Sequence, residues 1–110
     1  MALPSKNRLK KKKEFDHIFK NGSTVRGRFL LFKYTKMSGG TPKIGFIVPA
    51  KIVKKAVGRN KIRRLLANKV QKNISEINKD TVILLLKSPP PDSVEDQLSV
   101  ELANLLTKIQ

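Results

Sequence analysis

The sequence predicts a single α+β domain, residues 1–110, in which helices pack on one central mixed β-sheet in the order α-β-β-α-β-α. Apolar residues recur at helical spacing in three stretches: residues 13–20, 59–77 and 93–109. Three short apolar runs bounded by turn residues predict strands: residues 28–34, 43–48 and 81–86. A length of 110 residues with a hydrophobic fraction of 39% suits one domain with a small core.

The first part of the chain should be a basic arm followed by a short helix. Residues 1–12 are polar and basic, so we expect them to form a mobile N-terminal arm. Phe15, Ile18 and Phe19 share one helical face, and the Asn-Gly pair at 21–22 ends the helix. Core packing is the better interpretation for at least one of the two phenylalanines. The alternative is a stacking surface for an unpaired base.

The two strands that follow are expected to form a hairpin. The run at 28–34 is rich in aromatic and apolar residues, and a Ser-Gly-Gly-Thr-Pro turn at 38–42 separates it from 43–48. The next helix has an uncertain start, because an interior Gly58 costs about 1 kcal/mol against alanine. We therefore expect its first firm turn near Arg59, or later still if Asn60 is the N-cap.

The last third of the chain should supply the centre of the sheet and a covering helix. The run Thr-Val-Ile-Leu-Leu-Leu at 81–86 is the most apolar in the protein, which predicts a central strand buried on both faces. A proline-rich linker at 88–92 leads into a helix whose leucines and isoleucine follow helical spacing. This helix is expected to cover one face of the sheet.

The charge is large and unevenly distributed. The chain has 24 Lys+Arg against 8 Asp+Glu, a net charge of +16, and no acid lies between Asp16 and Glu76. Lys61, Arg64 and Lys72 fall on one side of the predicted helix, opposite its apolar stripe. A charge run of this kind is usually just a solvated face. Here the composition favours a polyanionic partner instead, because an asymmetric positive field of this size attracts polyanions.

Several other classes fit poorly. No apolar run is long enough to span a bilayer, and no apolar segment follows the basic N-terminus as a secretory signal requires. The chain has no cysteine and one histidine, His17, so we expect no metal site in the protein and a cytoplasmic location. The few acids form no spaced cluster, which disfavours a protein nuclease. A structural RNA-binding protein, such as a ribosomal protein, remains an alternative.

A motif in the basic segment resembles a known family. Residues 54–64 read Lys-Lys-Ala-Val-Gly-Arg-Asn-Lys-Ile-Arg-Arg, close to the A-V-x-R-N-R-x-K-R hallmark of the protein component of bacterial ribonuclease P. Further matches fall in family order at 7–9, 14–22, 29–32, 44–48 and 79–89. Lys61 stands where the family usually has arginine, which would weaken a bidentate contact. Pro49 and Ala50 replace a small residue and a lysine.

The resemblance implies an α/β sandwich with an unusual left-handed β-α-β crossover, similar to the second domain of ribosomal protein S5. It implies an accessory subunit of a ribonucleoprotein endoribonuclease whose catalytic centre is RNA, with Mg²⁺ entering through that RNA. The partners would be the catalytic RNA and precursor tRNA, and the protein would be monomeric outside the holoenzyme. Contacts to the catalytic RNA are expected from Lys51, Lys54, Lys55, Arg59, Asn60, Lys61, Arg63 and Arg64. Contacts to the single-stranded 5′ leader are expected from Arg8, Phe15, Phe19, Phe32 and Lys33.

Overall fold

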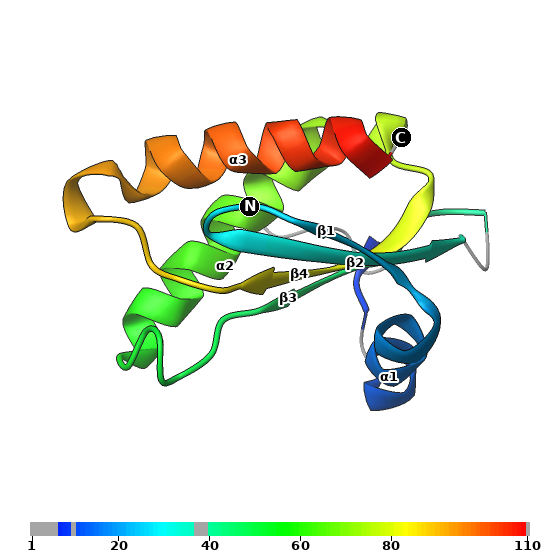
Figure 1. Cartoon of the computed structure of the whole chain (residues 1–110), viewed down its shortest axis with the longest axis horizontal. Coiled ribbons are helices and arrows are strands. Elements are labelled where there is room, and N and C mark those ends of the chain that lie inside the picture. The colour runs from blue at the N-terminus through cyan, green and yellow to red at the C-terminus, as the bar shows by residue number, and fades with distance from the viewer. Residues whose placement is uncertain (1–6, 10, 37–39, 110) are drawn as a thin grey trace.

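The computed structural model describes residues 7–9, 11–36 and 40–109, and it confirms the α+β class (Figure 1). The elements are α1 (Lys12–Asn21), β1 (Ser23–Arg26), β2 (Leu30–Lys36), β3 (Ile44–Ile47), α2 (Ala56–Lys72), β4 (Lys79–Leu85) and α3 (Val94–Ile109). Short 3₁₀ turns follow α2 at Ile74–Glu76 and precede α3 at Pro91–Ser93.

The strands form one mixed sheet in the order β1-β2-β4-β3. The predicted central strand is confirmed: β4 pairs antiparallel with β2 and parallel with β3. The predicted hairpin between 28–34 and 43–48 is wrong, because β4 lies between those two runs. The most apolar strand takes the position where both faces and both edges are covered. The left-handed sense of the β3-α2-β4 crossover and the likeness to ribosomal protein S5 stay predictions.

The hairpin in the structure joins β2 to β1, a strand that was not predicted from the sequence. β1 has four residues, three of them exposed, so it has no apolar run to mark it. The turn between the two strands is held by Glu101 of α3. Its carboxylate accepts hydrogen bonds from the backbone N–H groups of Arg28 at 2.7 Å, Phe29 at 2.7 Å and Leu30 at 2.5 Å. Donors that the hairpin leaves without a strand partner are thereby satisfied by the covering helix.

Helices cover both faces of the sheet (Figure 1). The larger core lies between the sheet and the pair α2 and α3, and it includes Leu30, Phe32, Leu66 and Leu98. The predicted stripe of α3 is confirmed by the burial of these side chains: Leu98, Leu102, Leu105, Leu106 and Ile109. On the opposite face, α1 packs through Ile18 on a smaller core with Leu9 and Val82.

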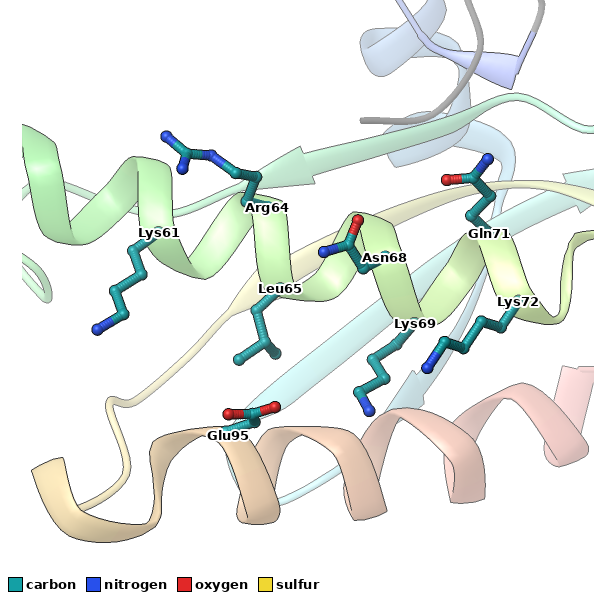
Figure 2. Close-up of a pocket in the computed structure, with 8 residues that line it drawn as sticks. All are labelled: Lys61, Arg64, Leu65, Asn68, Lys69, Gln71, Lys72 and Glu95. Atoms are coloured by element: carbon teal, nitrogen blue, oxygen red, sulfur yellow. The ribbon is translucent and has the colours of Figure 1, made fainter. Parts of the chain in front are cut away.

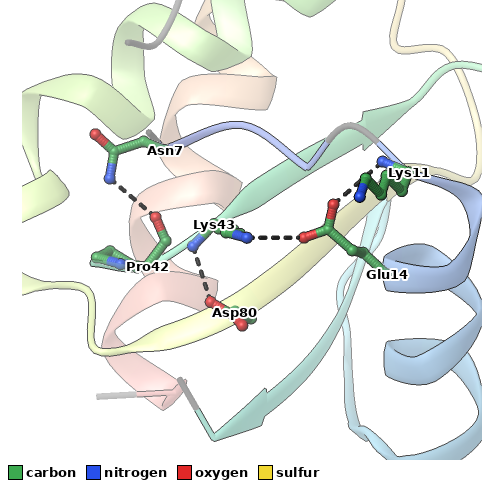
Figure 3. A network of polar contacts seen from close by, with 6 residues as sticks. All are labelled: Asn7, Lys11, Glu14, Pro42, Lys43 and Asp80. Carbon is green, nitrogen blue, oxygen red and sulfur yellow. Dashed lines mark hydrogen bonds and ion pairs between the residues drawn. The ribbon is translucent and has the colours of Figure 1, made fainter. Parts of the chain in front are cut away.

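The N-terminal arm is partly ordered, which corrects the prediction for residues 1–12. Asn7 is 4% exposed and donates from Nδ2 to the carbonyl of Pro42 at 2.9 Å (Figure 3). Leu9 N donates to Ile44 O at 3.0 Å, and Arg8 forms an isolated parallel β-bridge with Ile44. Residues 7–9 thus pair with the outer edge of β3, where unpaired backbone groups would otherwise be exposed. Residues 1–6 and 10 lie outside the described residues.

A polar network connects this edge to the rest of the fold (Figure 3). Lys43 forms a salt bridge from Nζ to Glu14 Oε2 at 3.1 Å, and its backbone N–H donates to Asp80 Oδ1 at 2.9 Å. Lys11 N donates to Glu14 Oε1 at 3.2 Å, which caps the start of α1. The network therefore fixes α1, the start of β3 and the start of β4 relative to one another.

Helix α2 begins at Ala56, earlier than the sequence indicated. Arg59 donates from Nη1 to the carbonyls of Val53 at 3.0 Å and Lys54 at 2.8 Å, so it ties the preceding loop to the first turn. A Cβ on Gly58 would lie 2.9 Å from Val53 Cγ1. Gly58, which led us to expect a later start, is the position at which the loop packs closely against α2.

Candidate RNA-binding interface

The predicted RNA-contact residues lie on one continuous segment, the loop before α2 and the first half of α2. Six of them are exposed: Lys51, Lys54, Lys55, Asn60, Lys61 and Arg64. Arg59 and Arg63 are half-buried. Arg63 donates from Nη2 to Asn60 Oδ1 at 2.5 Å, and Arg59 holds the loop. A guanidinium has five N–H donors, so both arginines keep donors for a ligand after these contacts.

A cleft on the outer side of β3 brings the two predicted contact sets together. It has a volume of about 360 Å³ and is lined by Arg8, Leu9, Phe15, Ile44, Gly45, Phe46, Asn60, Arg63, Arg64 and Ala67. The ordered N-terminal residues and α1 contribute Arg8 and Phe15, and α2 contributes Asn60, Arg63 and Arg64. Cationic groups and two aromatic rings therefore border one hollow, although Arg8 and Phe15 lie about 50 residues from the cations of α2 in sequence.

Gly45, which lines this cleft, allows the ring of Phe15 to pack against β3. A Cβ at this position would lie 2.5 Å from Phe15 Cε1, 2.6 Å from Phe15 Cζ and 2.9 Å from Leu9 Cδ1. The aromatic ring of α1 thus rests directly on the backbone of β3. The sequence reading assigned residues 43–48 to a strand and missed their place in the site. The signal was a glycine inside an apolar strand, which often marks a close approach to the backbone.

The other leader-contact predictions have different outcomes. Phe32 is wrong as a ligand contact, because its side chain is 0% exposed and lies in the core beneath α2 and α3. It shares that face with Leu30, since side chains two apart in a strand point the same way. Phe19 and Lys33 are half-buried and do not line the cleft. Lys33 pairs with Val82, whose side chain belongs to the α1 core.

Neither phenylalanine of α1 is fully buried. Ile18, at 2% exposure, is the buried residue of the helix, and Phe15 and Phe19 pack beside it half-buried. Part of each side chain therefore remains accessible to solvent. Phe15 differs from Phe19 because only Phe15 reaches the cleft.

The charge of the site is largely uncompensated by acidic side chains. Among the described residues, the structure shows one salt bridge, between Lys43 and Glu14, and none on the cations of residues 51–64. Closely spaced like charges repel one another. A polyanion seated on this surface would relieve that repulsion and release its own counterions.

Comparisons with known proteins identify the family of this chain. The family model described as Ribonuclease P matches residues 3–110. The chain belongs to the ribonuclease P protein component family.

Named relatives span most of the chain. The ribonuclease P protein component of Prochlorococcus marinus strain MIT 9515 is 33% identical over 123 aligned positions, which cover 98% of this chain and 95% of the relative. That of Fusobacterium nucleatum is 34% identical over 91 residues, covering 82% and 81%. The family supplies a subunit of an endoribonuclease complex that acts in tRNA processing and implies an RNA partner in the holoenzyme.

Solved structures show the same fold. The ribonuclease P protein from Staphylococcus aureus is 27% identical with a TM-score of 0.76, covering 99% of this chain and 93% of that one. The protein from Thermotoga maritima, in complex with 1-(4-fluorophenyl)-2-thiourea, has a TM-score of 0.77 at 24% identity, covering 94% and 100%. Within the described part of this chain, no helix is long and apolar enough to cross a membrane.

Proposed function

We propose that this chain is the subunit of ribonuclease P that binds the catalytic RNA and the 5′ leader of precursor tRNA. It would thereby assist endonucleolytic removal of the leader. The observation that carries the proposal is the cleft at the edge of β3, where Arg8 and Phe15 face Asn60, Arg63 and Arg64 across one hollow. RNA-binding proteins use this combination, with cations for phosphates and an aromatic ring for an unstacked base.

The two RNA segments would be bound by different parts of this surface. The exposed cations of residues 51–64 would contact the backbone of the catalytic RNA. Charged groups on flexible side chains suit phosphates, and such contacts do not depend on the RNA sequence. The leader would enter the cleft, where a base stacks on the accessible part of the Phe15 ring and Arg8 pairs with a phosphate. Phe19 and Lys33, on the α1 side of the sheet, would act at most where the leader leaves the cleft.

The chemistry of cleavage is assigned to the RNA. Mg²⁺ would be held by the catalytic RNA and not by this chain, and the protein would contribute affinity and charge screening. The complex would act in the cytoplasm, with the protein monomeric outside the holoenzyme.

Cleavage of a precursor tRNA by a bacterial catalytic RNA at low Mg²⁺, with and without this protein, tests the proposal. We expect the protein to restore cleavage at the mature 5′ end, and more so for longer leaders. Phe15→Leu should reduce the advantage of a long leader, and Phe15→Tyr, which keeps the ring, should retain it. A protein that binds the RNA without changing cleavage or leader dependence would instead be a structural RNA-binding protein.

Salt dependence provides a second measure. If about eight phosphates are neutralised, the slope of log K against log salt should be near −7, taking about −0.9 per contact as the ceiling. A slope near −2 would contradict an interface of this extent.

A further inference from the structure

A second basic hollow lies on the other side of α2, between α2 and α3. We call it the α2–α3 groove, and its volume is about 750 Å³. Figure 2 shows Lys61, Lys69 and Lys72 of α2 extending toward α3, with Leu65 between them and Glu95 of α3 opposite. Lys69 and Lys72 lie beyond the residues assigned to RNA contact above. They also lie away from the β3 cleft, which neither of them lines.

The lysines of this groove lack acidic partners. No salt bridge joins Lys61, Lys69 or Lys72 to a carboxylate among the described residues, and Glu95 is the one acid that lines the groove. Lys69 and Lys72 are three residues apart on one helix, so their like charges repel. The groove therefore concentrates positive potential between two helices, where low-dielectric walls strengthen the field.

The dimensions suit a phosphodiester backbone. At 1.5 Å per residue, the distance along α2 from Lys61 to Lys72 is about 17 Å, enough for several phosphates of one strand. Lysines act as point charges on flexible stems and do not demand bidentate geometry. The half-buried Leu65 lies beneath the lysine stems and offers no competing polar group. These features favour a backbone held by charge over a base read by its edge.

We propose that the α2–α3 groove binds the backbone of the catalytic RNA, so that this RNA contacts α2 on two sides. The inference rests on the proposed function above and extends it to Lys69 and Lys72. Its occupant is a structured RNA backbone and not the leader, because the groove has no accessible aromatic ring among its lining residues. Glu95 opposes this binding by repelling phosphates at the groove wall.

A structural role for the lysines makes a different prediction. Lys69 and Lys72 lie in the last turn of α2, where positive charge stabilises a helix through its dipole. If that were their whole role, replacing them would lower thermal stability and leave RNA binding unchanged. The test must therefore measure both properties.

The experiment compares two double variants that remove the same charge. Lys69→Gln with Lys72→Gln alters the groove. Lys20→Gln with Lys36→Gln is the control, because both lysines are exposed, line neither the groove nor the β3 cleft, and Lys20 also lies in the last turn of its helix. Binding to the catalytic RNA alone is measured across a series of salt concentrations, and melting temperatures are recorded for every protein.

We expect the groove variant to weaken binding and to make the slope of log K against log salt less steep by about 1.4 to 1.8, which corresponds to two lost phosphate contacts. The control should keep the wild-type slope. Lys72→Gln alone should change the slope by about half as much, and it preserves the half-buried Lys69 if the double variant fails to fold. Equal slopes for the two double variants, or a melting change without a slope change, would overturn the inference.

Glu95 supplies a variant of opposite sign. Glu95→Gln should tighten RNA binding, and Asp96→Asn, one position along α3 and outside the groove, should not. Equal effects would overturn the placement of the RNA in the groove. Failure of wild-type protein to bind or stimulate the RNA would instead overturn the proposed function itself. Cleavage assays should show the groove variant impaired equally with short and long leaders.

Discussion

Glu101 is predicted to be among the most destabilising positions to replace outside the apolar core. Glu101→Ala removes three hydrogen bonds to the turn between β1 and β2. The Arg28 N–H is exposed and regains water, whereas the N–H groups of Phe29 and Leu30 are part-buried and lose their acceptor. A buried donor left unsatisfied costs about 1–3 kcal/mol. For the two N–H groups of Phe29 and Leu30 together, we therefore expect a loss of about 2–6 kcal/mol in the free energy of unfolding.

Urea denaturation followed by far-UV circular dichroism measures this loss. The midpoint should fall while the m-value stays constant, because the surface exposed on unfolding is unchanged. Glu101→Gln should be less harmful than Glu101→Ala, because its carbonyl oxygen can still accept from Phe29 and Leu30 while its NH₂ group faces the exposed N–H of Arg28. The matched control is Asp96→Asn on the same helix, an exposed residue expected to change stability by less than about 0.5 kcal/mol. A Glu101→Ala variant as stable as this control would refute the role assigned to the carboxylate.

Three further predictions concern the cleft and its supports. Gly45→Ala should push the Phe15 ring off β3, lowering leader-dependent stimulation of cleavage and costing about 1–3 kcal/mol in urea denaturation; wild-type leader dependence would contradict the packing described. Asn7→Ala should lose the hydrogen bond to Pro42 at a cost of about 1–2 kcal/mol, and proteolysis near the N-terminus should become faster. Asn104→Ala, at an exposed asparagine of α3, is the control. Phe32→Leu should reduce stability by about 1–2 kcal/mol without a selective loss for long leaders, and a selective loss would show that this buried ring reaches the ligand after all.

The sequence was most informative where a pattern depended on burial alone. The central strand and the stripe of α3 were predicted because apolar residues at a fixed period have one stable arrangement. The partner of each strand was not predictable in the same way. The runs at 28–34 and 43–48 are separated by a turn, so their local sequence fits a hairpin. In the structure each run pairs with β4 instead, which is the most apolar strand. β1 was missed because a short, exposed strand has no burial pattern.

The residues of the candidate site also differ in how well the sequence predicts them. Its cations could be identified from charge and motif, because exposed lysines and arginines need no particular packing to be recognised. The aromatic contacts could not be sorted, because the sequence did not show that Phe32 of β2 faces the larger core while Phe15 of α1 packs on the opposite side of the sheet. The role of Gly45 depends on a contact between α1 and β3. These elements are far apart in sequence, so no local pattern predicts the contact.

The central position of β4 has a consequence for the order in which the fold can be made. β2 and β3 do not touch as strands, and each pairs with β4, which the ribosome synthesises after both. The parallel pair must also wait for α2 to cross over, and Glu101 comes later still. The pairings of β4 with β2 and β3 therefore join parts of the chain that are distant in sequence, and such pairings form slowly. Until residue 85 has emerged from the ribosome, the nascent chain carries a large excess of positive charge, and the edges of β2 and β3 that pair with β4 remain open.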